Sequence, residues 1–330
     1  MVTFKKILVP TDFSQGAEGA YSVAQKVADT FGGKIDFINV IPTLKYFSES
    51  FKGLGVPLDM NKDIYPKVKQ ETFHKLKKAM GNYLKDENKG EQFVKIDRRP
   101  SDAIAKFAAE NGYDLIVMGA KGSHKSRMVR GGTTERVIRK SKVPVFSVDS
   151  RFEFSKIKNV VMTTDSSPLS FAAFPMALAI ADTFKANLTL FHVIELYGSA
   201  SEDIPRVPEK GEAVSIYEEI IKRLNSYLAD QGMDKIHVQK TGVTFEDMVT
   251  ITDGEDSRSV PLFTKIEKAV SAHYEIENYT TESADLVVMA THGHSGFAHL
   301  ILGSTAEKIA EYVKKPVITI RPDKTQLKKK

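Results

Sequence analysis

An internal repeat constrains this chain more than any other feature. The segment Ile7–Asp12 returns as Val160–Asp165, 153 positions later, with a similar apolar run that ends in Thr-Asp. Near the end of each half, Asp114–Gly119 returns as Asp285–Ala290 at an offset of 171. Self-similarity at a fixed period is the signature of a duplicated structural unit. The 330 residues therefore predict two related domains of about 150 residues each.

Each half alternates short apolar runs with helical patterns. In the first half, the run Ile7–Val9 is typical of a strand that is buried on both faces. Ser14 stands in the N-cap position of the helical pattern that follows, and Gly32 ends that pattern. Further strands are expected at residues 35–41, 93–97, 115–118 and 143–148, and further helices at about 66–85, 101–111 and 133–140. Such alternation needs crossover connections, which predict a parallel sheet.

The register of the repeat also sets the expected domain limits. They are residues 1–149 for the first domain, 150–156 for a linker, 157–323 for the second domain and 324–330 for a basic tail. Changes in the offset place about nine extra residues in the first half, within 42–65, and about 27 in the second half. We expect the latter as an insert at about 250–278. Its acidic segment 252–257 lacks the spacing and the closing Glu of a calcium-binding loop, so a solvated turn is favoured.

The composition is that of an ordinary globular protein, with 42% hydrophobic and 27% charged residues. The sequence has no apolar run of about 18 residues and no signal-peptide core, so we expect no membrane association and a cytoplasmic location. The absence of cysteine excludes disulfides, thiolate catalysis and cysteine-based metal sites. A net charge of +5 would permit nucleic-acid binding. The lysines are spread over predicted helix faces among 42 acidic residues, which favours a solvated surface instead.

A loop of small residues follows the fourth expected strand of the second half. It runs from Ala290 through Gly293 to Gly303 and Ser304, where a helical pattern begins. A strand that leads through such a loop into a helix places the free N–H groups of the first helical turn where an anion can bind. Glycines at such a turn often serve the turn alone. The recurrence of the same arrangement after Gly119 in the first half is what favours an anion site.

Three histidines in this loop, His292, His294 and His299, could be read as a metal cluster. No carboxylate stands at a fixed spacing from them, as a zinc site would need. Contact with phosphate or with solvent is the favoured interpretation, and no metal site is predicted.

The order of strand, Asp, helix, strand ending in Val, and late glycine-rich loop resembles the universal stress protein family in its tandem two-domain form. The family pattern of the late loop is Gly, two residues, Gly, nine residues and Gly-Ser, and the second half departs from it only at Ala290. The resemblance covers residues 3–149 and 156–321. It implies an α/β fold of two tandem Rossmann-like domains, of the adenine-nucleotide α-hydrolase type. Each would hold a five-stranded parallel sheet in the order 3-2-1-4-5.

The resemblance also implies an ATP-binding cleft at the carboxyl ends of the strands, with Mg²⁺ as an optional companion of the phosphates. In the second half the implied residues are Asp165, Val193, Ala290, Gly293, Gly303, Ser304 and Thr305. In the first half they are Asp12, Val40, Gly119, Gly122, Gly131, Gly132 and Thr133. The Asp and the backbone of the Val would hold adenosine, and the glycines and the hydroxyl would hold phosphates. Two alternatives stay open: the Asp residues could cap helices, and the Val residues are core residues in either case.

Three classes of function fit these residues. The preferred one is a nucleotide-binding protein in which ATP is a ligand for stress response or signalling through partner binding. A nucleotidyl-transfer enzyme would need a His-x-Gly-His or Ser-Gly-Gly-x-Asp-Ser loop directly after the first strand, where Thr11–Ser14 stands instead. A structural module with empty clefts that binds other proteins is the third. No catalytic residue is predicted, and we expect slow ATP hydrolysis at most.

The linker of about seven residues also suggests how the two domains are arranged. Members of the resembled family dimerise through the last strand, so the resemblance implies an internal pseudo-dimer in this chain. The last expected strands, 143–148 and 317–321, would lie at the contact and cover each other's edges. Further homodimerisation and protein partners of unknown identity remain open.

The spacing within the two late loops predicts unequal sites. Glu135 and Glu307 stand at matching positions in the last helix of each half, and counting back from them aligns Gly132 with Ser304. In this register the first-half loop is one residue short and lacks the first hydroxyl. Loss of one hydrogen bond to a charged group costs about 1.5–3 kcal/mol. This corresponds to roughly ten- to a hundredfold in affinity, so we expect the second half to bind ATP more tightly.

This ranking can be tested by calorimetry. Ser304→Ala and Gly293→Val should lower the affinity for ATP far more than Thr133→Ala and Gly122→Val. Abolished binding in the first-half variants together with intact binding in the second-half variants would show that the ranking is wrong.

Overall fold

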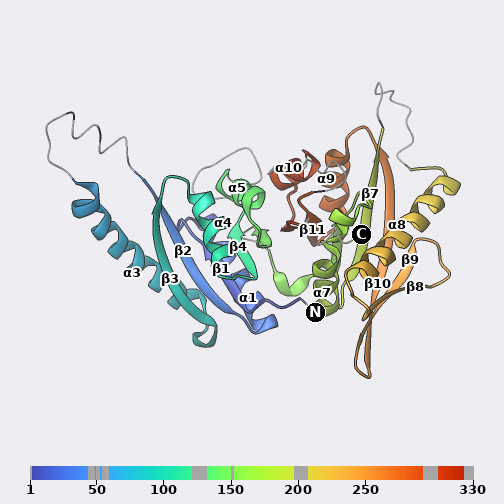
Figure 1. The fold of residues 1–330 in the computed structure, drawn as a ribbon, viewed down its shortest axis with the longest axis horizontal. Coiled ribbons are helices and arrows are strands. Elements are labelled where there is room, and N and C mark those ends of the chain that lie inside the picture. The colour runs from blue at the N-terminus through green and yellow to red at the C-terminus, as the bar shows by residue number, and fades with distance from the viewer. Residues whose placement is uncertain are drawn as a thin grey trace. The chain divides into compact units, whose positions relative to one another are not determined.

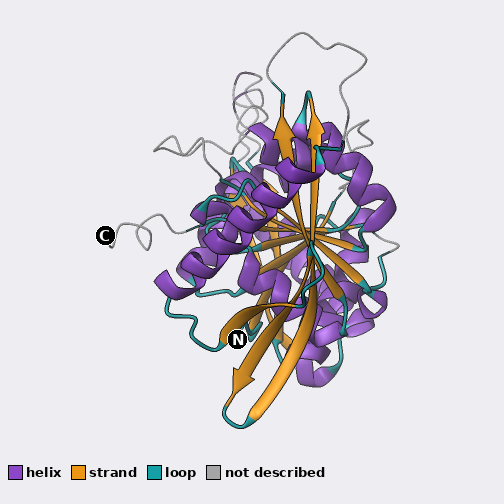
Figure 2. Ribbon diagram, turned by 90° about the vertical axis from the view of Figure 1, so that its right-hand side faces the viewer, coloured by secondary structure: helices purple, strands orange, loops and turns teal. Residues whose placement is uncertain are grey.

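A computed structural model describes residues 2–43, 49, 53, 59–120, 132–149, 152–196, 207–292 and 304–322. These residues form two α/β units, one from Thr3 to Phe152 and one that starts at Glu153 (Figure 1). In each unit, helices flank the strands (Figure 2). No helix within the described ranges is both long and apolar enough to cross a membrane.

The first unit alternates strands and helices along the chain. Its strands are β1 (Lys6–Pro10), β2 (Lys34–Pro42), β3 (Lys89–Asp97), β4 (Leu115–Gly119) and β5 (Val145–Val148). Its helices are α1 (Gln15–Phe31), α3 (Tyr65–Tyr83), α4 (Pro100–Glu110) and α5 (Gly132–Lys140), with short turns η1 (Met60–Ile64) and η2 (Asp86–Asn88). The boundaries predicted from the apolar runs agree with these to within a few residues.

The sheet of the first unit has the order β3-β2-β1-β4-β5, and all its strand pairs are parallel. The central strand β1 pairs on both edges, with Ile7 opposite Ile35 of β2 and Leu115 of β4. Residues Ile7, Leu8 and Val9 are fully buried, as a strand covered by helices on both faces requires. The predicted strand order is therefore confirmed in this unit.

The second unit repeats this alternation of strands and helices and has additional strands. Its strands are β6 (Asn159–Thr163), β7 (Asn187–Glu195), β8 (Ile236–Lys240), β9 (Glu246–Asp253), β10 (Asp256–Ala269), β11 (Leu286–Ala290) and β12 (Val317–Ile320). Its helices are α6 (Pro168–Phe171), α7 (Phe174–Phe184), α8 (Lys210–Asp230), α9 (Ala272–Ser283) and α10 (Ser304–Tyr312), after the short turn η3 (Phe154–Lys156).

The described strands of the second unit lie in the order β12-β11-β6-β7-β10-β9-β8. The first five are parallel neighbours and reproduce the expected order, whereas β9 and β8 extend the sheet by antiparallel pairing. The expectation of a five-stranded, wholly parallel sheet thus needs correction in this half. The sheet keeps that core and gains two strands at one edge.

The position expected for the insert also needs correction. Residues 262–269 of β10 pair with β7, so this part of β10 is the counterpart of β3. The additional strands β8 and β9 precede it, at residues 236–253, so they overlap only the start of the expected range 250–278. A change in the repeat offset gives the number of added residues but leaves their place between two matched segments open. The acidic segment forms the exposed turn of the β9–β10 hairpin, with Gly254 at a φ of 69°.

The start of β4 and of β11 is fixed in the same way in both units. Asp114 Oδ2 accepts hydrogen bonds of 2.8 Å from the backbone N–H groups of Lys5 and Lys6. Asp285 Oδ2 accepts the equivalent bonds, at 2.9 Å, from Lys158 and Asn159. Each carboxylate therefore ties the central strand to its neighbour at the amino edge of the sheet.

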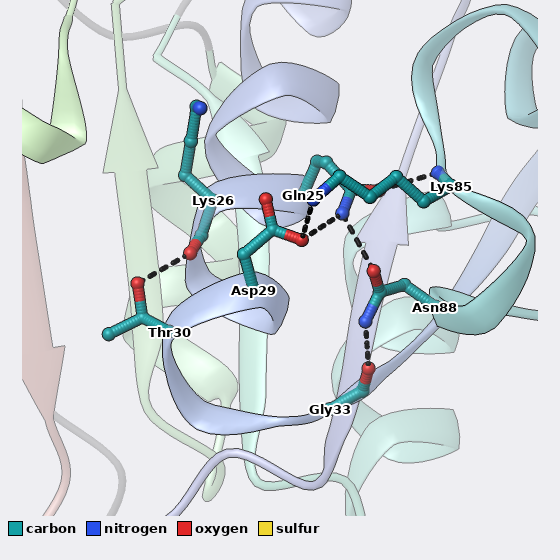
Figure 3. A network of polar contacts seen from close by, with 7 residues as sticks. All are labelled: Gln25, Lys26, Asp29, Thr30, Gly33, Lys85 and Asn88. Carbon is teal, nitrogen blue, oxygen red and sulfur yellow. Dashed lines mark hydrogen bonds and ion pairs between the residues drawn. The ribbon is translucent and has the colours of Figure 1, made fainter.

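A polar network closes the amino edge of the first unit (Figure 3). Gln25 on α1 donates to Asp29 and to Asn88, at 2.7 and 2.8 Å, and accepts a bond of 2.9 Å from the backbone of Lys85. Asn88 in turn donates to the carbonyl of Gly33, which directly precedes β2. These bonds join α1, η2 and the start of β2. They therefore fix the C-terminal part of α1 at the amino edge of the sheet.

The end of β4 passes very close to the start of α1. A Cβ at Gly119 would lie 2.1 Å from the carbonyl oxygen of Gly16, so only glycine fits there. In the second unit Ala290 stands at the matching position, and the matching helix is divided into α6 and α7. Pro175 lies in the first turn of α7, where its missing N–H cannot continue the preceding helix. The unit with glycine thus has an unbroken first helix, and the unit with alanine has a divided one.

Two glycine-to-alanine variants should shift stability in opposite directions. Gly119→Ala forces α1 away from β4 and should destabilise the first unit by about 1–3 kcal/mol. Gly81→Ala adds a Cβ within α3 that meets no atom within 4 Å, and should stabilise that helix by about 0.5–1 kcal/mol. Urea unfolding followed by circular dichroism measures both shifts. Equal midpoints for the two variants would contradict the close approach.

Candidate functional site

A cavity of about 380 Å³ opens at the carboxyl ends of β1, β2 and β4 in the first unit. It is lined by Pro10, Thr11, Asp12, Ala17, Ile38, Asn39, Val40, Ile41, Pro42, Pro100, Ile104, Met118, Gly119, Gly132, Thr133 and Thr134. Five of the residues predicted for a first-half site, Asp12, Val40, Gly119, Gly132 and Thr133, are therefore brought together. The other two, Gly122 and Gly131, lie outside the described residues.

The loop between β1 and α1 positions Asp12. Thr11 Oγ1 accepts the N–H of Phe13, at 2.9 Å, and Phe13 takes a φ of 61°. Asp12 Oδ1 accepts from the N–H and the hydroxyl of Ser14, at 3.0 and 2.5 Å. Ser14 itself caps α1 by accepting the N–H of Ala17 at 3.3 Å. Ser14 is therefore the N-cap, while Asp12 is exposed and lines the cavity.

The second unit builds the same loop after β6. Thr164 Oγ1 accepts the N–H of Ser166 at 2.9 Å, and Ser166 also takes a φ of 61°. Asp165 Oδ1 accepts the N–H of Ser167 at 3.0 Å, and Ser167 caps α6 through the N–H of Ser170 at 3.1 Å. The repeated sequence therefore adopts the same backbone geometry in both units. This includes the residue with positive φ after the Asp.

Two side chains in the middle strands hold these loops, and sequence reasoning did not identify them. Asn39 Nδ2 donates to the carbonyl oxygen of Thr11 at 2.7 Å. In the second unit, His192 Nδ1 lies 2.9 Å from the carbonyl oxygen of Thr164. Both precede the predicted Val by one position, and a polar residue within an apolar run was the signal available in the sequence.

Thr134 is a third contributor that the sequence did not reveal. Its buried hydroxyl donates to the carbonyl oxygen of Gly119 at 2.9 Å, which ties the first turn of α5 to the end of β4. Gly132 and Thr133 in the same turn line the cavity. The first turn of α5, whose N–H groups have no partner within the helix, therefore faces the cavity.

Tyr21 on α1 contacts the loop that carries Asp12. Its hydroxyl contacts the hydroxyl of Thr11 below the loop, and it is 1% exposed. Burial is the main cause that raises the pKa of Tyr21 to about 12. The side chain therefore stays neutral at physiological pH and supplies structure, not a base.

The residues predicted for the second-half site are described only in part. Asp165 lies in the loop after β6, Val193 is partly buried on β7, and Ala290 is buried at the end of β11. Gly293 and Gly303 lie outside the described residues, and of Ser304 and Thr305 only the helical backbone at the start of α10 is described. The expected ranking of the two halves therefore stays a prediction.

The histidine cluster is likewise described only at its first member. His292 is 8% exposed, and its Nδ1 lies 2.9 Å from the hydroxyl of Thr291. His294 and His299 lie outside the described ranges. Within those ranges, no three His, Asp or Glu side chains gather in a way that could hold a metal ion.

Replacing Thr134 should loosen α5. Thr134→Val keeps the shape of the side chain but leaves the buried carbonyl of Gly119 without this donor, so stability should fall by about 1–3 kcal/mol. Thr133→Val, at the exposed neighbouring position, should stay within about 0.5 kcal/mol of the wild type. Thermal unfolding of both variants measures the difference. Equal losses would mean that the Thr134 hydroxyl does not fix the helix.

Comparison with known proteins gives matches along the whole chain. A universal stress protein of Methanocaldococcus jannaschii is 30% identical over 156 residues, which cover 44% of this chain and 96% of that protein. One from Synechocystis sp. is 23% identical over 331 residues, which cover 96% of this chain and 100% of that protein. A crystal structure from Archaeoglobus fulgidus has a TM-score of 0.58 at 18% identity and covers 96% of this chain and 98% of its own. This last likeness concerns the fold.

The family pattern itself occurs twice. The pattern described as the Universal stress protein family matches residues 3–149 and again residues 156–321. The two matches correspond to the two units and to the duplicated loops described above. This chain therefore belongs to the universal stress protein family and carries two of its domains in tandem.

Proposed function

We propose that this chain binds an adenine nucleotide, ATP in the first instance, as a ligand for stress response or signalling through partner binding. The observation that carries the proposal is the first-unit cavity. It joins Asp12, Val40, Gly119, Gly132 and Thr133 at the carboxyl edge of a parallel sheet, where open α/β sheets generally bind ligands. Its volume of about 380 Å³ lies in the range of small-molecule sites.

The two ends of the cavity suit different parts of a nucleotide. Ile38, Ile104 and Met118 give it apolar walls, on which a purine ring can pack. The exposed Asp12 carboxylate and the backbone at the end of β2 offer hydrogen-bond acceptors to the adenosine. The first turn of α5 offers N–H donors, with Thr133 beside them, to the phosphates.

The second unit supports a second site of the same kind. Its loop after β6 has the hydrogen bonds and the backbone conformation of the first-unit loop, with Asp165 in the place of Asp12. Its glycine-rich sequence from Ala290 to Ser304 matches the family pattern more fully. We therefore propose one nucleotide per unit.

Binding is favoured over rapid turnover. Among the described residues that line the first-unit cavity, Asp12 is the sole titratable side chain, and it accepts hydrogen bonds from Ser14. A general base must lie within reach of the attacking water at the phosphate end. In the proposed orientation Asp12 faces the adenosine, so at most slow hydrolysis is expected.

Filling the phosphate end of the cavity should remove one site. At Gly132 a Cβ would meet no protein atom closer than 3.9 Å, so Gly132→Val is accommodated by the fold while its methyl groups cover the first turn of α5. Calorimetry with ATP should show loss of the first-unit site or at least about a tenfold weaker affinity there. Gly211→Val is the matched control, because Gly211 lies in the first turn of α8 with no atom within 4 Å.

Two outcomes would overturn the proposal. Identical titrations for wild type and Gly132→Val would show that this cavity is not the nucleotide site. An absence of ATP, ADP or AMP binding to the wild type would favour the structural module. Phosphate release near about 10 per second, the median enzyme rate, would instead favour the enzyme.

A further inference from the structure

A second, smaller cavity lies beside the first. It has a volume of about 220 Å³ and is lined by Arg98, Arg99, Pro100, Ser101, Asp102, Thr133, Arg136 and Lys140. Pro100 and Thr133 line both cavities, so the two spaces adjoin at the start of α4 and α5. The larger cavity is mainly apolar along its walls, whereas the smaller one gathers four cationic side chains.

One carboxylate, Asp102, offsets part of this charge. Lys140 donates to Asp102 Oδ1, and Arg99 Nε lies 3.4 Å from Asp102 Oδ2. The hydrogen bond from Lys140 is the largest cause that lowers the pKa of Asp102, so the carboxylate stays ionised at neutral pH. Arg98 and Arg136 are exposed, and no carboxylate in the described part of the chain forms an ion pair with them. Two guanidinium groups therefore remain available to an anionic ligand.

Arg136 links the two cavities. It follows Gly132 by one helical turn on α5, so both residues lie on the same face of the helix. A Cβ at Gly132 would lie 3.9 Å from Arg136 Nη2, which places the guanidinium beside the first turn of the helix. An anion held by the N–H groups of this turn would therefore have Arg136 as its neighbour.

The second unit keeps only part of this charge. β10 and β3 end at matching positions, and so do α9 and α4 at their starts, which places Val270 opposite Arg98 and Tyr274 opposite Asp102. The register of α10 and α5 likewise places Tyr312 opposite Lys140. These three residues are 52%, 64% and 43% exposed. Two cationic positions of the first unit, Arg98 and Lys140, are thus Val270 and Tyr312 in the second, whereas Arg136 is matched by Lys308.

We infer that the smaller cavity of the first unit, here the basic cavity, binds the distal phosphoryl groups of the nucleotide held in the larger cavity. It thereby selects nucleoside triphosphates over monophosphates. The inference rests on the proposed function of the larger cavity. A guanidinium group presents paired N–H donors that match the oxygens of a phosphate, and Arg98 and Arg136 have this capacity unused. A monophosphate would end at the first turn of α5, while the longer chain of ATP reaches past Thr133 to the arginines.

The test is a titration of the full chain with AMP, ADP, ATP and inorganic tripolyphosphate. The variant Arg98→Gln with Arg136→Gln should bind ATP and tripolyphosphate at least about tenfold more weakly than the wild type. Its affinity for AMP at the same site should change by less than about twofold. Both arginines belong to the first unit, so the difference between wild type and variant isolates that unit.

Lys142→Gln is the matched control. It removes one positive charge from an exposed position of the same unit that lines neither cavity. Its affinities for AMP, ADP, ATP and tripolyphosphate should stay within about twofold of the wild-type values. This result separates local recognition from the effect of net charge. Added salt should weaken ATP binding more in the wild type than in the double variant, because the arginine contribution is screened.

The outcomes separate this inference from the proposed function. If Gly132→Val weakens AMP and ATP while the arginine variant weakens neither, or weakens both equally, the basic cavity does not select by phosphate number and the inference is wrong. If Gly132→Val changes the affinity for none of the nucleotides, but the arginine variant still binds tripolyphosphate more weakly, the proposed function is wrong. The basic cavity is then a polyphosphate site. Unchanged tripolyphosphate binding in the arginine variant would overturn the inference in either case.

Discussion

The backbone contacts at the end of β4 determine the geometry of the first-unit cleft. Gly119 packs against the backbone of Gly16 at the start of α1, and its carbonyl accepts the buried hydroxyl of Thr134 at the start of α5. Two helix N-termini are thereby fixed to one strand end. The loop that carries Asp12 and the turn that carries Gly132 consequently face a common space. Because interiors are close-packed, an added methyl group here would move a helix, and with it the cleft.

The duplication made the fold predictable. The alternation of apolar runs and helical patterns in both copies predicted parallel sheets, and the family resemblance implied the strand order that the first unit and the core of the second unit have. The strands β8 and β9 were not predicted because they have no counterpart in the first half. They pair in antiparallel fashion at one edge of the sheet. The offset could count their residues, yet only the pairing of β10 with β7 shows that they precede the third core strand.

The site was predictable where a motif or a repeat marked it. Asp12, Val40 and Gly119 line one cavity, because the ends of neighbouring parallel strands meet at one edge. Asn39 and Thr134 act through single hydrogen bonds to carbonyl groups of other segments, and no spacing along the sequence encodes such contacts. The basic cavity was not predicted from the sequence for the same reason. Its cations come from the turn before α4 and from α5, which only the fold brings together.

The two units show which part of such a site the backbone fixes and which part side chains decide. Both keep the strained residue after the first Asp, Phe13 in one and Ser166 in the other, and both keep the capping hydroxyl that follows it. The side chains beside the basic cavity differ in part: Arg98 and Lys140 of the first unit are matched by Val270 and Tyr312 of the second. These positions lie outside the sheet core, so their side chains can change without repacking it. Two units with one backbone plan can therefore differ in the charge of the side chains that surround it.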